Sequence, residues 1–315
     1  MPVSKNEYLS EVWKDGIFDN KVVFCTGGAG TICSAQVRAM VHLGADACIV
    51  GRNVEKTERM AQDIATARKG ARVIGIGSVD VRKVESLQDS VETCVKELGA
   101  IDYVIAGAAG NFLAPISQLS SNAFKSVMDI DVLGSYNTLK ATLPHLYDSA
   151  AKHRTDGISG KSDIERTPRF DVFNFATLHY TGTPLQAHVS VAKAGVDALS
   201  TSVSIEAGPR GVTSNIIAPG PIGGSEGIGR LVKEEQSKAA QARVPVGRFG
   251  TVKEVADATV YLFSDAGNFV NGEVLVVDGG SWRTQGGHFS GFSYPGFFLA
   301  DEAGTGAASG KKSKL

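Results

Sequence analysis

The chain has 315 residues, of which 43% are hydrophobic and 21% are charged, and its formal net charge is −1. This size and composition predict a soluble globular protein with a sizeable core, equivalent to one large or two ordinary domains. The near-neutral charge leaves no basic stripe suited to nucleic acid, and no apolar run is long enough to span a membrane. We therefore expect neither a nucleic-acid partner nor a membrane span.

Four cysteines and six histidines are scattered along the chain. No two cysteines form a C-x-x-C pair, and three of the four lie in or beside apolar runs, so we expect small buried thiols rather than disulfides. No H-E-x-x-H motif or Cys/His cluster is present, so we expect no metal site. The cysteines are Cys25, Cys33, Cys48 and Cys94.

Residues 1–19 contain no apolar run typical of a signal peptide, and we expect them to form an N-terminal extension on the surface. An apolar β-branched run follows at 21–26, then the small residues Gly27-Gly28-Ala29-Gly30, then an amphipathic helical pattern over 30–43. A strand, a glycine turn and a helix in this order offer backbone N–H groups and a helix N-terminus to a phosphate. The pattern predicts a dinucleotide-binding turn.

Strands and helices alternate through the rest of the chain. The expected strands are 21–26, 45–51, 72–79, 101–106, 171–176, 212–218 and 273–277, and the expected helices are 30–43, 53–69, 85–98, 121–149, 190–207, 226–242 and 253–263. Near-continuous apolar strands that alternate with helices indicate a parallel sheet covered on both faces. We therefore predict an α/β, Rossmann-type doubly wound sheet of about seven parallel strands in a single domain.

The predicted domain spans residues 20–282. The polar, charged stretch 152–169 lies between a helix and a strand, and we expect it to be a surface insertion. Residues 283–315 are expected to form a C-terminal tail. The tail ends in Ser313-Lys314-Leu315, the peroxisomal import address, after a small, polar segment that would leave it accessible. This ending predicts recognition by the peroxisomal import receptor and a location in the peroxisomal matrix.

The second predicted strand ends in Gly51-Arg52-Asn53. An acidic residue at this position would select NAD through the ribose hydroxyls, whereas an arginine pairs with the 2′-phosphate of NADP. The alternative is a solvated arginine ahead of a helix. Because no Asp or Glu occupies the strand end, we predict NADP.

Several motifs occur in a characteristic order and together resemble the short-chain dehydrogenase/reductase family over about residues 20–282. They are Thr26-Gly27-Gly28, Asp80-Val81, Ala108-Ala109-Gly110, Lys193 at the start of a helix, and Pro219-Gly220. Finer details resemble its 2,4-dienoyl-CoA reductase branch, and the terminal Ser313-Lys314-Leu315 points to the peroxisomal members. These details are Asn111-Phe112, residues 122–125, Asp129-Ile130-Asp131, residues 190–195 and Pro221-Ile222.

Departures from the family pattern narrow the chemistry that the resemblance implies. Most members have a tyrosine four residues before the lysine, where this chain has Val189, and the usual serine falls near Ala176. The chain therefore lacks the hydroxyl that reduction of an ordinary carbonyl requires. The glycine turn also departs from the pattern, because Thr31 and Cys33 stand where glycines are usual. We expect these changes to weaken the motif without abolishing binding.

The resemblance implies NADPH-dependent reduction of 2,4-dienoyl-CoA to 3-enoyl-CoA in peroxisomal β-oxidation. In that branch, hydride transfer leaves a dienolate, and an Asp and a Lys hold the water that protonates its α carbon. Asp131, in place of the usual asparagine, and Lys193 match these catalytic positions. Mitochondrial relatives use a tyrosine instead, and Tyr180 is an outside candidate because its spacing differs.

The resemblance also implies binding residues. Asp80 and Val81 would hold the adenine, Lys193 the nicotinamide ribose, and the segment after the sixth strand the nicotinamide. The full cofactor set is Gly27, Gly28, Ala29, Gly30, Thr31, Ile32, Arg52, Asn53, Asp80, Val81, Lys193, Pro219, Gly220 and Ile222. The acyl-CoA set is Arg82, Phe112, Ser120, Asn122 and Arg230, although the arginines could instead be solvated and Phe112 could belong to the core.

Alternatives to this activity remain open from the sequence. A trans-2-enoyl-CoA or 3-oxoacyl-CoA reductase would share the fold, and Val189 argues against only the second. A non-catalytic NADPH-binding protein would tolerate the missing tyrosine, but it would not need Asp131 beside Lys193. Family resemblance further predicts a homodimer or homotetramer formed through residues 121–149 and 190–207.

Overall fold

The computed structural model describes residues 3–152, 169–173, 177–225 and 237–284. They form a parallel sheet of seven strands in the order β3-β2-β1-β4-β5-β6-β7. The strands are β1 Val22–Thr26, β2 Asp46–Val50, β3 Val73–Ile76, β4 Tyr103–Ala106, β5 Arg169–Phe173, β6 Thr213–Pro219 and β7 Val274–Val277. The predicted fold class, a doubly wound α/β sheet in a single domain, is confirmed.

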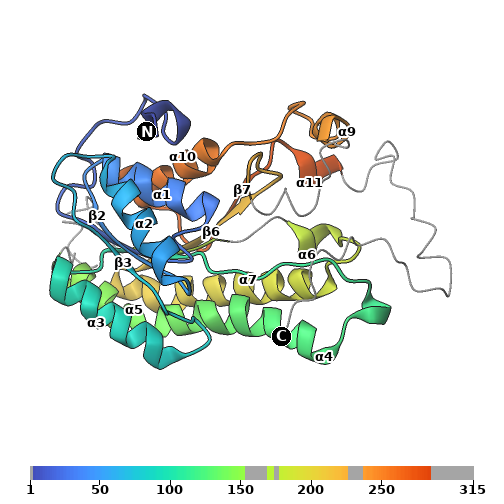
Figure 1. Ribbon diagram of the computed structural model, residues 1–315, viewed down its shortest axis with the longest axis horizontal. Helices are drawn as coiled ribbons and strands as arrows, with labels where there is room; N and C mark the ends of the chain where they lie inside the picture. The colour runs from blue at the N-terminus through green and yellow to red at the C-terminus, as the bar shows by residue number, and fades with distance from the viewer. Residues whose placement is uncertain (1–2, 153–168, 174–176, 226–236, 285–315) are drawn as a thin grey trace.

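Helices cover both faces of this sheet (Figure 1). One face packs against α1 Thr31–His42, α2 Val54–Ala65 and α10 Val252–Phe263. The other packs against α3 Val84–Leu98, α5 Gly134–Lys152 and α7 Ala187–Ala207. Short helices complete the fold: η1 Lys5–Glu7, η2 Ile116–Gln118, α4 Ser121–Val127, α6 Leu178–Thr181, η5 Gly208–Arg210, α9 Ser237–Ala242, η7 Asp265–Gly267 and α11 Ser281–Thr284.

The strand order reverses between β1 and β4, which are neighbours in the sheet although two strands and three helices separate them in sequence. Their carboxyl ends are in register, with Thr26 opposite Ala106. In open α/β sheets the loops that leave such a pair diverge to opposite faces and open a crevice between them. The topology therefore places a crevice directly after Thr26 and Ala106.

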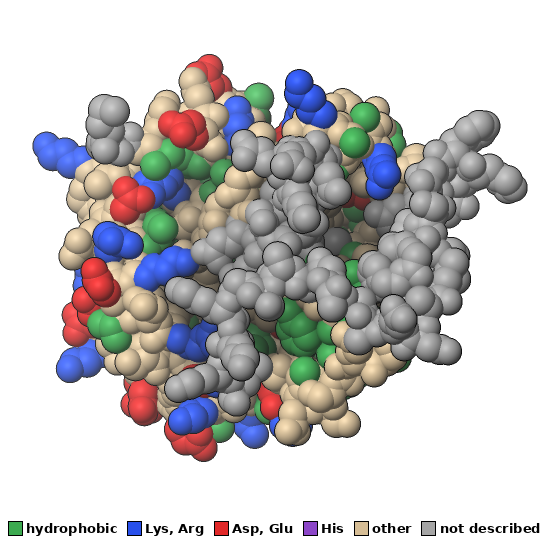
Figure 2. All heavy atoms as spheres, turned by 45° about the vertical axis from the view of Figure 1, so that its right-hand side comes forward, with side chains coloured by type: hydrophobic (Ala, Val, Ile, Leu, Met, Phe, Trp, Pro, Cys, Tyr) green, Lys and Arg blue, Asp and Glu red, His purple; other side chains and the backbone are tan. Residues whose placement is uncertain are grey.

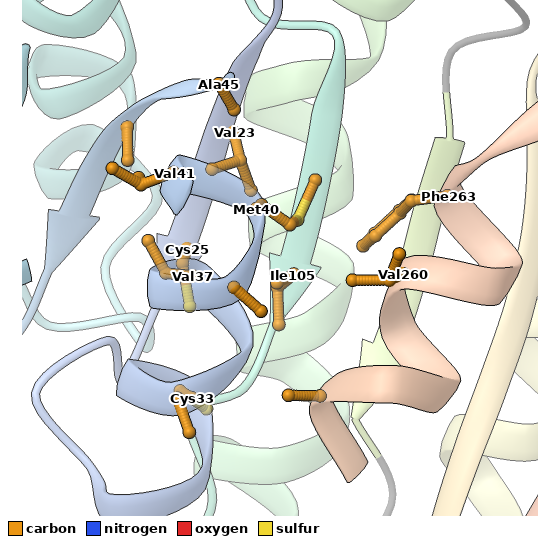
Figure 3. Packing of buried hydrophobic residues seen from close by; sticks show 14 of the residues in the cluster. Val23, Cys25, Cys33, Val37, Met40, Val41, Ala45, Ile105, Val260 and Phe263 are labelled. Atoms are coloured by element: carbon orange, nitrogen blue, oxygen red, sulfur yellow. The ribbon is translucent and has the colours of Figure 1, made fainter. Parts of the chain in front are cut away.

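Helix α1 packs its apolar side chains against the sheet (Figure 3). Its inward residues Val37 and Met40 pack with Val23 and Ile105 of the strands and with Phe263 of α10. At the turn before this helix, a Cβ atom on Gly28 would lie 2.5 Å from the Cβ of Ile49. A glycine is needed there because any side chain would push the turn away from β2.

The helix that was predicted over residues 121–149 is interrupted. Helix α4 ends at Val127, a π-helix follows over Met128–Leu133, and α5 begins at Gly134. A π-helical turn carries an additional residue per turn, and such turns occur frequently at functional sites. Here the π-helix contains Asp131, whose backbone oxygen accepts a hydrogen bond from the Ser135 hydroxyl at 2.6 Å.

The expectation of a surface N-terminal extension is wrong for three of its large apolar side chains. Tyr8, Leu9 and Phe18 are buried in the core beside α1 and α10. Asp257 of α10 accepts hydrogen bonds from the Ser10 hydroxyl at 2.5 Å and from the Trp13 indole N–H at 2.8 Å. Burial of three large apolar side chains outweighs the polar character of the segment.

Other boundaries moved by a few residues. Helix α2 is capped by the Asn53 side chain, as predicted, but it ends at Ala65 rather than Lys69. The Thr66 hydroxyl bonds the Asp63 carbonyl oxygen at 2.6 Å at this end. Most of the predicted insertion 152–169, nearly all of the tail 283–315 and the part of the predicted helix over 226–236 lie outside the described residues.

Charged side chains of both signs are interspersed over the described part of the face shown in Figure 2.

No helix among the described residues is long and apolar enough to cross a membrane. The four cysteines are free and buried, as the sequence predicted.

Candidate active site

A cavity of about 650 Å³ occupies the crevice after β1 and β4. Its lining includes ten of the predicted cofactor residues, and it also includes Arg82 and Val189. These ten are Gly27, Ala29, Gly30, Thr31, Ile32, Arg52, Asn53, Asp80, Val81 and Lys193. One cavity thus brings together residues from the glycine turn, the ends of β2 and β3, and helix α7.

The glycine turn forms one wall of the cavity. Gly27 has a φ of 66°, and a Cβ atom there would lie 2.9 Å from the Gly107 oxygen. The Gly30 N–H donates to the Gly27 oxygen at 2.9 Å, and Gly30 is the N-cap of α1. The first N–H groups of a helix have no intrahelical acceptor and carry a partial positive charge, so this wall suits a pyrophosphate.

Cys33 replaces the last glycine that is usual in the turn, and the structure accommodates it on the opposite loop. The Cys33 thiol faces the Gly107 oxygen at 3.8 Å, and a Cβ atom on Gly107 would lie 2.3 Å from the Cys33 sulfur. The Cys33 side chain occupies the space that a side chain at position 107 would otherwise fill, so the glycine that close packing requires stands at 107 rather than at 33. This exchange explains how the turn keeps its close packing despite the substitution.

Charged groups surround the cavity beyond the ends of β2 and β3. Arg52 lines it beside Asn53, and Arg82 and Asp80 form an ion pair, with a shortest N–O distance of 2.6 Å. The hydrogen bonds from Arg82 lower the pKa of Asp80, with a smaller contribution from Arg52. Arg82, predicted to bind acyl-CoA, thus lies in the same cavity as the predicted cofactor residues.

Asp131 and Lys193 form a fully buried ion pair, with exposed fractions of 1% and 2%. The Lys193 ammonium donates to Asp131 Oδ2 at 2.7 Å, and the Gly110 N–H donates to Oδ1 at 2.7 Å. Both carboxylate oxygens of Asp131 therefore accept a hydrogen bond, one from a backbone N–H and one from the Lys193 ammonium. The π-helix presents the carboxylate and α7 presents the ammonium.

No tyrosine hydroxyl lies on the α7 face near this pair. Val189, one turn before Lys193, is fully buried and lines the cavity. Tyr180 is 53% exposed, and its hydroxyl donates to Asp197 at 3.0 Å. Burial and the Asp197 carboxylate raise the pKa of Tyr180 to about 12. Its hydroxyl is thus occupied by Asp197, and it does not line the cavity.

The remaining predicted residues lie outside the cavity lining. Gly28 packs against β2, Pro219 ends β6, Gly220 abuts Asp278, and Ile222 is buried beside Gly250. For the acyl-CoA set, Ser120 caps α4, Asn122 is exposed, Phe112 is half-buried against α7, and Arg230 lies outside the described residues. The structure therefore gathers the cofactor set more completely than the substrate set.

Sequence reasoning overlooked several residues of the site. The Gly110 backbone N–H holds Asp131, although Gly110 was noted only as part of a motif. Asn111, Ile130 and Ser225 also line the cavity. Asn111 and Ser225 lie close in sequence to recognised motifs, and this closeness could have suggested that they belong to the site. Their residue types alone do not predict that they line a cavity.

Comparisons with known proteins agree with this geometry. Residues 21–156 match the family described as short chain dehydrogenase, and residues 172–281 match the one described as Enoyl-(Acyl carrier protein) reductase. A peroxisomal 2,4-dienoyl-CoA reductase [(3E)-enoyl-CoA-producing] of Saccharomyces cerevisiae is 46% identical over 284 residues, which cover 90% of this chain and 91% of that one. The chain belongs to the short-chain dehydrogenase/reductase family.

Two further relatives are less similar in sequence. The protein of the same activity name from Danio rerio is 37% identical over 280 residues, 89% of this chain and 87% of its own. A short chain dehydrogenase from Bacillus anthracis, of known crystal structure, is 30% identical and has a TM-score of 0.73, covering 84% of this chain and 97% of that one.

Membership of the short-chain dehydrogenase/reductase family implies an oxidoreductase with a nicotinamide cofactor. The residues present fit such a group. The turn holds Gly27 at a positive φ, residues of the α1 N-terminus line the cavity, and Lys193 lines it as well. Gly27 to Ile32 would hold the pyrophosphate, and Asp80 and Val81 would contact the adenine.

Proposed function

We propose that this short-chain dehydrogenase/reductase reduces 2,4-dienoyl-CoA to 3-enoyl-CoA with NADPH, in peroxisomal β-oxidation of unsaturated fatty acids. The observation that carries the proposal is the buried Asp131–Lys193 pair, whose Lys193 lines the cavity together with Val189, which replaces the usual tyrosine. The names of the Saccharomyces cerevisiae and Danio rerio relatives support the same activity.

The bound cofactor supplies a hydride to the far end of the conjugated diene. The protein's own residues then stabilise the negative charge on the substrate and position the source of the proton. The Lys193 ammonium stabilises negative charge that develops on the substrate, because it is a cation in a site from which water is largely excluded. Asp131 accepts a hydrogen bond from that ammonium and holds it in place.

We infer that the Asp131–Lys193 pair holds the water that donates a proton to the substrate's α carbon. One donor of the ammonium is committed to Asp131, which leaves two others for a water or for the substrate. A carbonyl reductase would instead need a hydroxyl beside the substrate oxygen, and Val189 provides none. The pair therefore favours reduction of a carbon–carbon double bond.

NADPH rather than NADH is proposed from Arg52. It lines the cavity at the end of β2, where an acidic residue would favour NADH and an arginine can pair with the 2′-phosphate. Arg82 lies in the same cavity and can add positive charge near that phosphate, although its guanidinium is paired with Asp80. For the acyl-CoA, we retain Arg82, Phe112, Ser120, Asn122 and Arg230 as the proposed contacts.

The cellular location and assembly are also proposals. Recognition of Ser313-Lys314-Leu315 by the import receptor would carry the enzyme to the peroxisomal matrix, and the relatives named as peroxisomal support this location. A homodimer or homotetramer through α5 and α7 is supported by apolar side chains exposed on them, such as Tyr136, Val191 and Ile205.

NADPH oxidation by the purified protein, followed by absorbance, tests this function with three substrates. We expect turnover with 2,4-hexadienoyl-CoA and none with 2-hexenoyl-CoA or acetoacetyl-CoA. Turnover of 2-hexenoyl-CoA would make the protein a trans-2-enoyl-CoA reductase. Binding of NADPH without turnover of any substrate would make it a non-catalytic binding protein.

A further inference from the structure

Hydrogen bonds and a ring contact join two segments that are distant in sequence and lie near the Asp131–Lys193 pair. One is the loop 110–114, which follows β4, and the other is the segment 185–188, which begins α7. The Ala114 N–H donates to the Leu185 oxygen at 2.9 Å, and the Gln186 amide donates to Asn111 Oδ1 at 3.1 Å. We call these contacts, together with those of His188, the loop clamp.

His188 makes two contacts to one residue of the loop. Its Nε2 lies 3.1 Å from the Phe112 backbone oxygen, and its ring stacks on the Phe112 ring at a centroid distance of 4.1 Å and an interplanar angle of 26°. A carbonyl oxygen can only accept, so Nε2 carries the hydrogen and Nδ1 carries a lone pair when the ring is neutral. The contact thus fixes the tautomer of the imidazole.

The His188 ring has an exposed fraction of 0%, and its Nδ1 has no hydrogen-bond partner among the residues that the structure describes. Burial lowers the pKa of His188 below its usual value, which keeps the ring neutral near pH 7. A buried acceptor without a partner costs free energy, and an apolar ring could provide the stacking without that cost. Packing alone therefore does not explain a histidine here.

The loop clamp is connected to the catalytic pair by the chain itself. The Gly110 N–H, two residues before Phe112, donates to Asp131, and Val189, the residue after His188, lines the cavity. Leu185 adopts a φ of 68°, a conformation that a leucine rarely takes. Strained backbone of this kind persists where surrounding contacts enforce it, often beside active sites.

We propose that His188 is a positioning residue: its neutral imidazole holds the loop 110–112 against α7 through the Phe112 carbonyl. The loop then presents the Gly110 N–H to Asp131 and the Phe112 ring to the acyl group of the substrate. The assignment of a substrate to Phe112 rests on the proposed function. The loop clamp itself depends only on the contacts among Asn111, Phe112, Leu185, Gln186 and His188.

Two substitutions separate the hydrogen bond from the stacking. His188→Phe keeps an aromatic ring and removes the donor, whereas His188→Gln keeps an N–H donor of similar reach. For His188→Phe we expect kcat with 2,4-hexadienoyl-CoA to fall about threefold to tenfold, the scale of one lost buried hydrogen bond, and KM for that substrate to rise. The Kd for NADPH should not change, and His188→Gln should recover most of the loss.

His42→Phe is the matched control. His42 also makes a side-chain hydrogen bond, 3.1 Å from Nδ1 to the Tyr8 hydroxyl, and an aromatic contact to the same residue. It lies at the far end of α1, where its Nε2 is also 3.7 Å from an Asp15 carboxylate oxygen. A merely structural effect would lower Tm in both Phe variants and leave KM unchanged. Wild-type kcat and KM in His188→Phe, or a His188→Gln variant no better than His188→Phe, would overturn the proposal.

Amide hydrogen exchange of the free protein distinguishes failure of this proposal from failure of the proposed function, because it needs no substrate. Exchange at Gly110 and Ala114, whose N–H groups are hydrogen-bonded, should be faster in His188→Phe than in the wild type, and unchanged in His42→Phe. Faster exchange in a protein that does not reduce dienoyl-CoA would retain the loop clamp and reject the activity. Unchanged exchange would reject the loop clamp, whatever the substrate.

Discussion

Two ion pairs contribute residues to the same cavity, both partners in one pair and Lys193 alone in the other, and their surroundings differ sharply. Asp131–Lys193 is closed from solvent, with side-chain exposures of 1% and 3%, and its carboxylate also accepts the Gly110 N–H. Asp80–Arg82 is open, with side-chain exposures of 20% and 42%. The N–O distances are nearly equal, 2.7 and 2.6 Å, so distance alone does not distinguish the two pairs.

Burial decides what each pair can do. A buried pair is fixed in place, and loss of one partner leaves a charge that water cannot reach, at a cost of about 3–5 kcal/mol. An exposed pair exchanges its partner for water or for a ligand at little cost, typically less than about 1 kcal/mol. The first arrangement suits a catalytic group that must not move, and the second suits recognition of a charged cofactor.

Removal of the buried Asp131 carboxylate should have the largest effect on turnover. We expect Asp131→Ala to lower turnover of 2,4-hexadienoyl-CoA about a hundredfold or more, the scale of one proton-transfer group, while NADPH binding persists. Stopped-flow absorbance and NADPH fluorescence measure the two effects. Asp131→Asn, which can still accept from Gly110, separates loss of charge from loss of packing.

Asp129→Ala is the control for that prediction, because Asp129 lies in the same π-helix but pairs with the exposed Lys125. Its turnover should stay near that of the wild type. Full activity in Asp131→Ala would place the proton donor elsewhere, and Tyr180 would be the next residue to substitute.

Reversal of the charge at Arg52, which lines the cavity at the end of β2, should alter the preference for NADPH over NADH rather than the reduction of the substrate. We expect Arg52→Asp to lower the ratio of kcat/KM for NADPH to that for NADH about tenfold to a hundredfold, because one charge-assisted contact to the 2′-phosphate becomes repulsive. Arg59→Asp, an exposed change on α2 outside the cavity, should leave the ratio unchanged. An unchanged ratio in Arg52→Asp would assign selection of the phosphate to another residue.

Disruption of the exposed pair should have a much smaller effect on folding. We expect Arg82→Ala to change the free energy of unfolding by less than about 1 kcal/mol in urea denaturation. Asp131→Ala should destabilise the protein several times more. Equal losses in the two variants would remove the distinction between the buried and the exposed pair.

The smallest effect concerns pH. Because Arg82 lowers the pKa of Asp80 in the folded state, Asp80 contributes stability that is present above the unfolded pKa of about 3.9 and is lost as the pH falls through the folded value. The Tm difference between the wild type and Asp80→Asn should therefore be small near pH 6 and vanish as the pH falls below about 4. A difference that grew on acidification would contradict this sign.

The fold and the gathering of residues around the glycine turn into one cavity were largely predictable because they follow from local patterns. Apolar strand runs, the turn Gly27 to Gly30 and the Asn53 helix cap act within a few residues of themselves. The buried N-terminal residues Tyr8 and Phe18 were not predicted, because nothing in a short irregular segment shows that it packs on α10. The π-helix was also missed, because its hydrophobic pattern is close to that of an α-helix.

The surroundings of Asp131 and Phe112 depend on contacts between residues that are far apart in the sequence. Gly110 and Asp131 are 21 positions apart, and Phe112 and His188 are 76 apart. The backbone N–H that holds Asp131 belongs to every residue type except proline, so residue identity gives no signal of its role. His188 likewise resembles any helix histidine until its neighbours are known.

The sequence by itself determined that a parallel α/β sheet carries a glycine turn after its first strand, since both depend on short-range periodicity and on backbone freedom at glycine. It also supplied the residue types that the proposed reaction uses: Asp131, Lys193 and a valine at position 189. Only the tertiary structure decided that one carboxylate is buried with two donors while another stays open to solvent. Burial depends on what every other element covers, and local sequence does not contain that information.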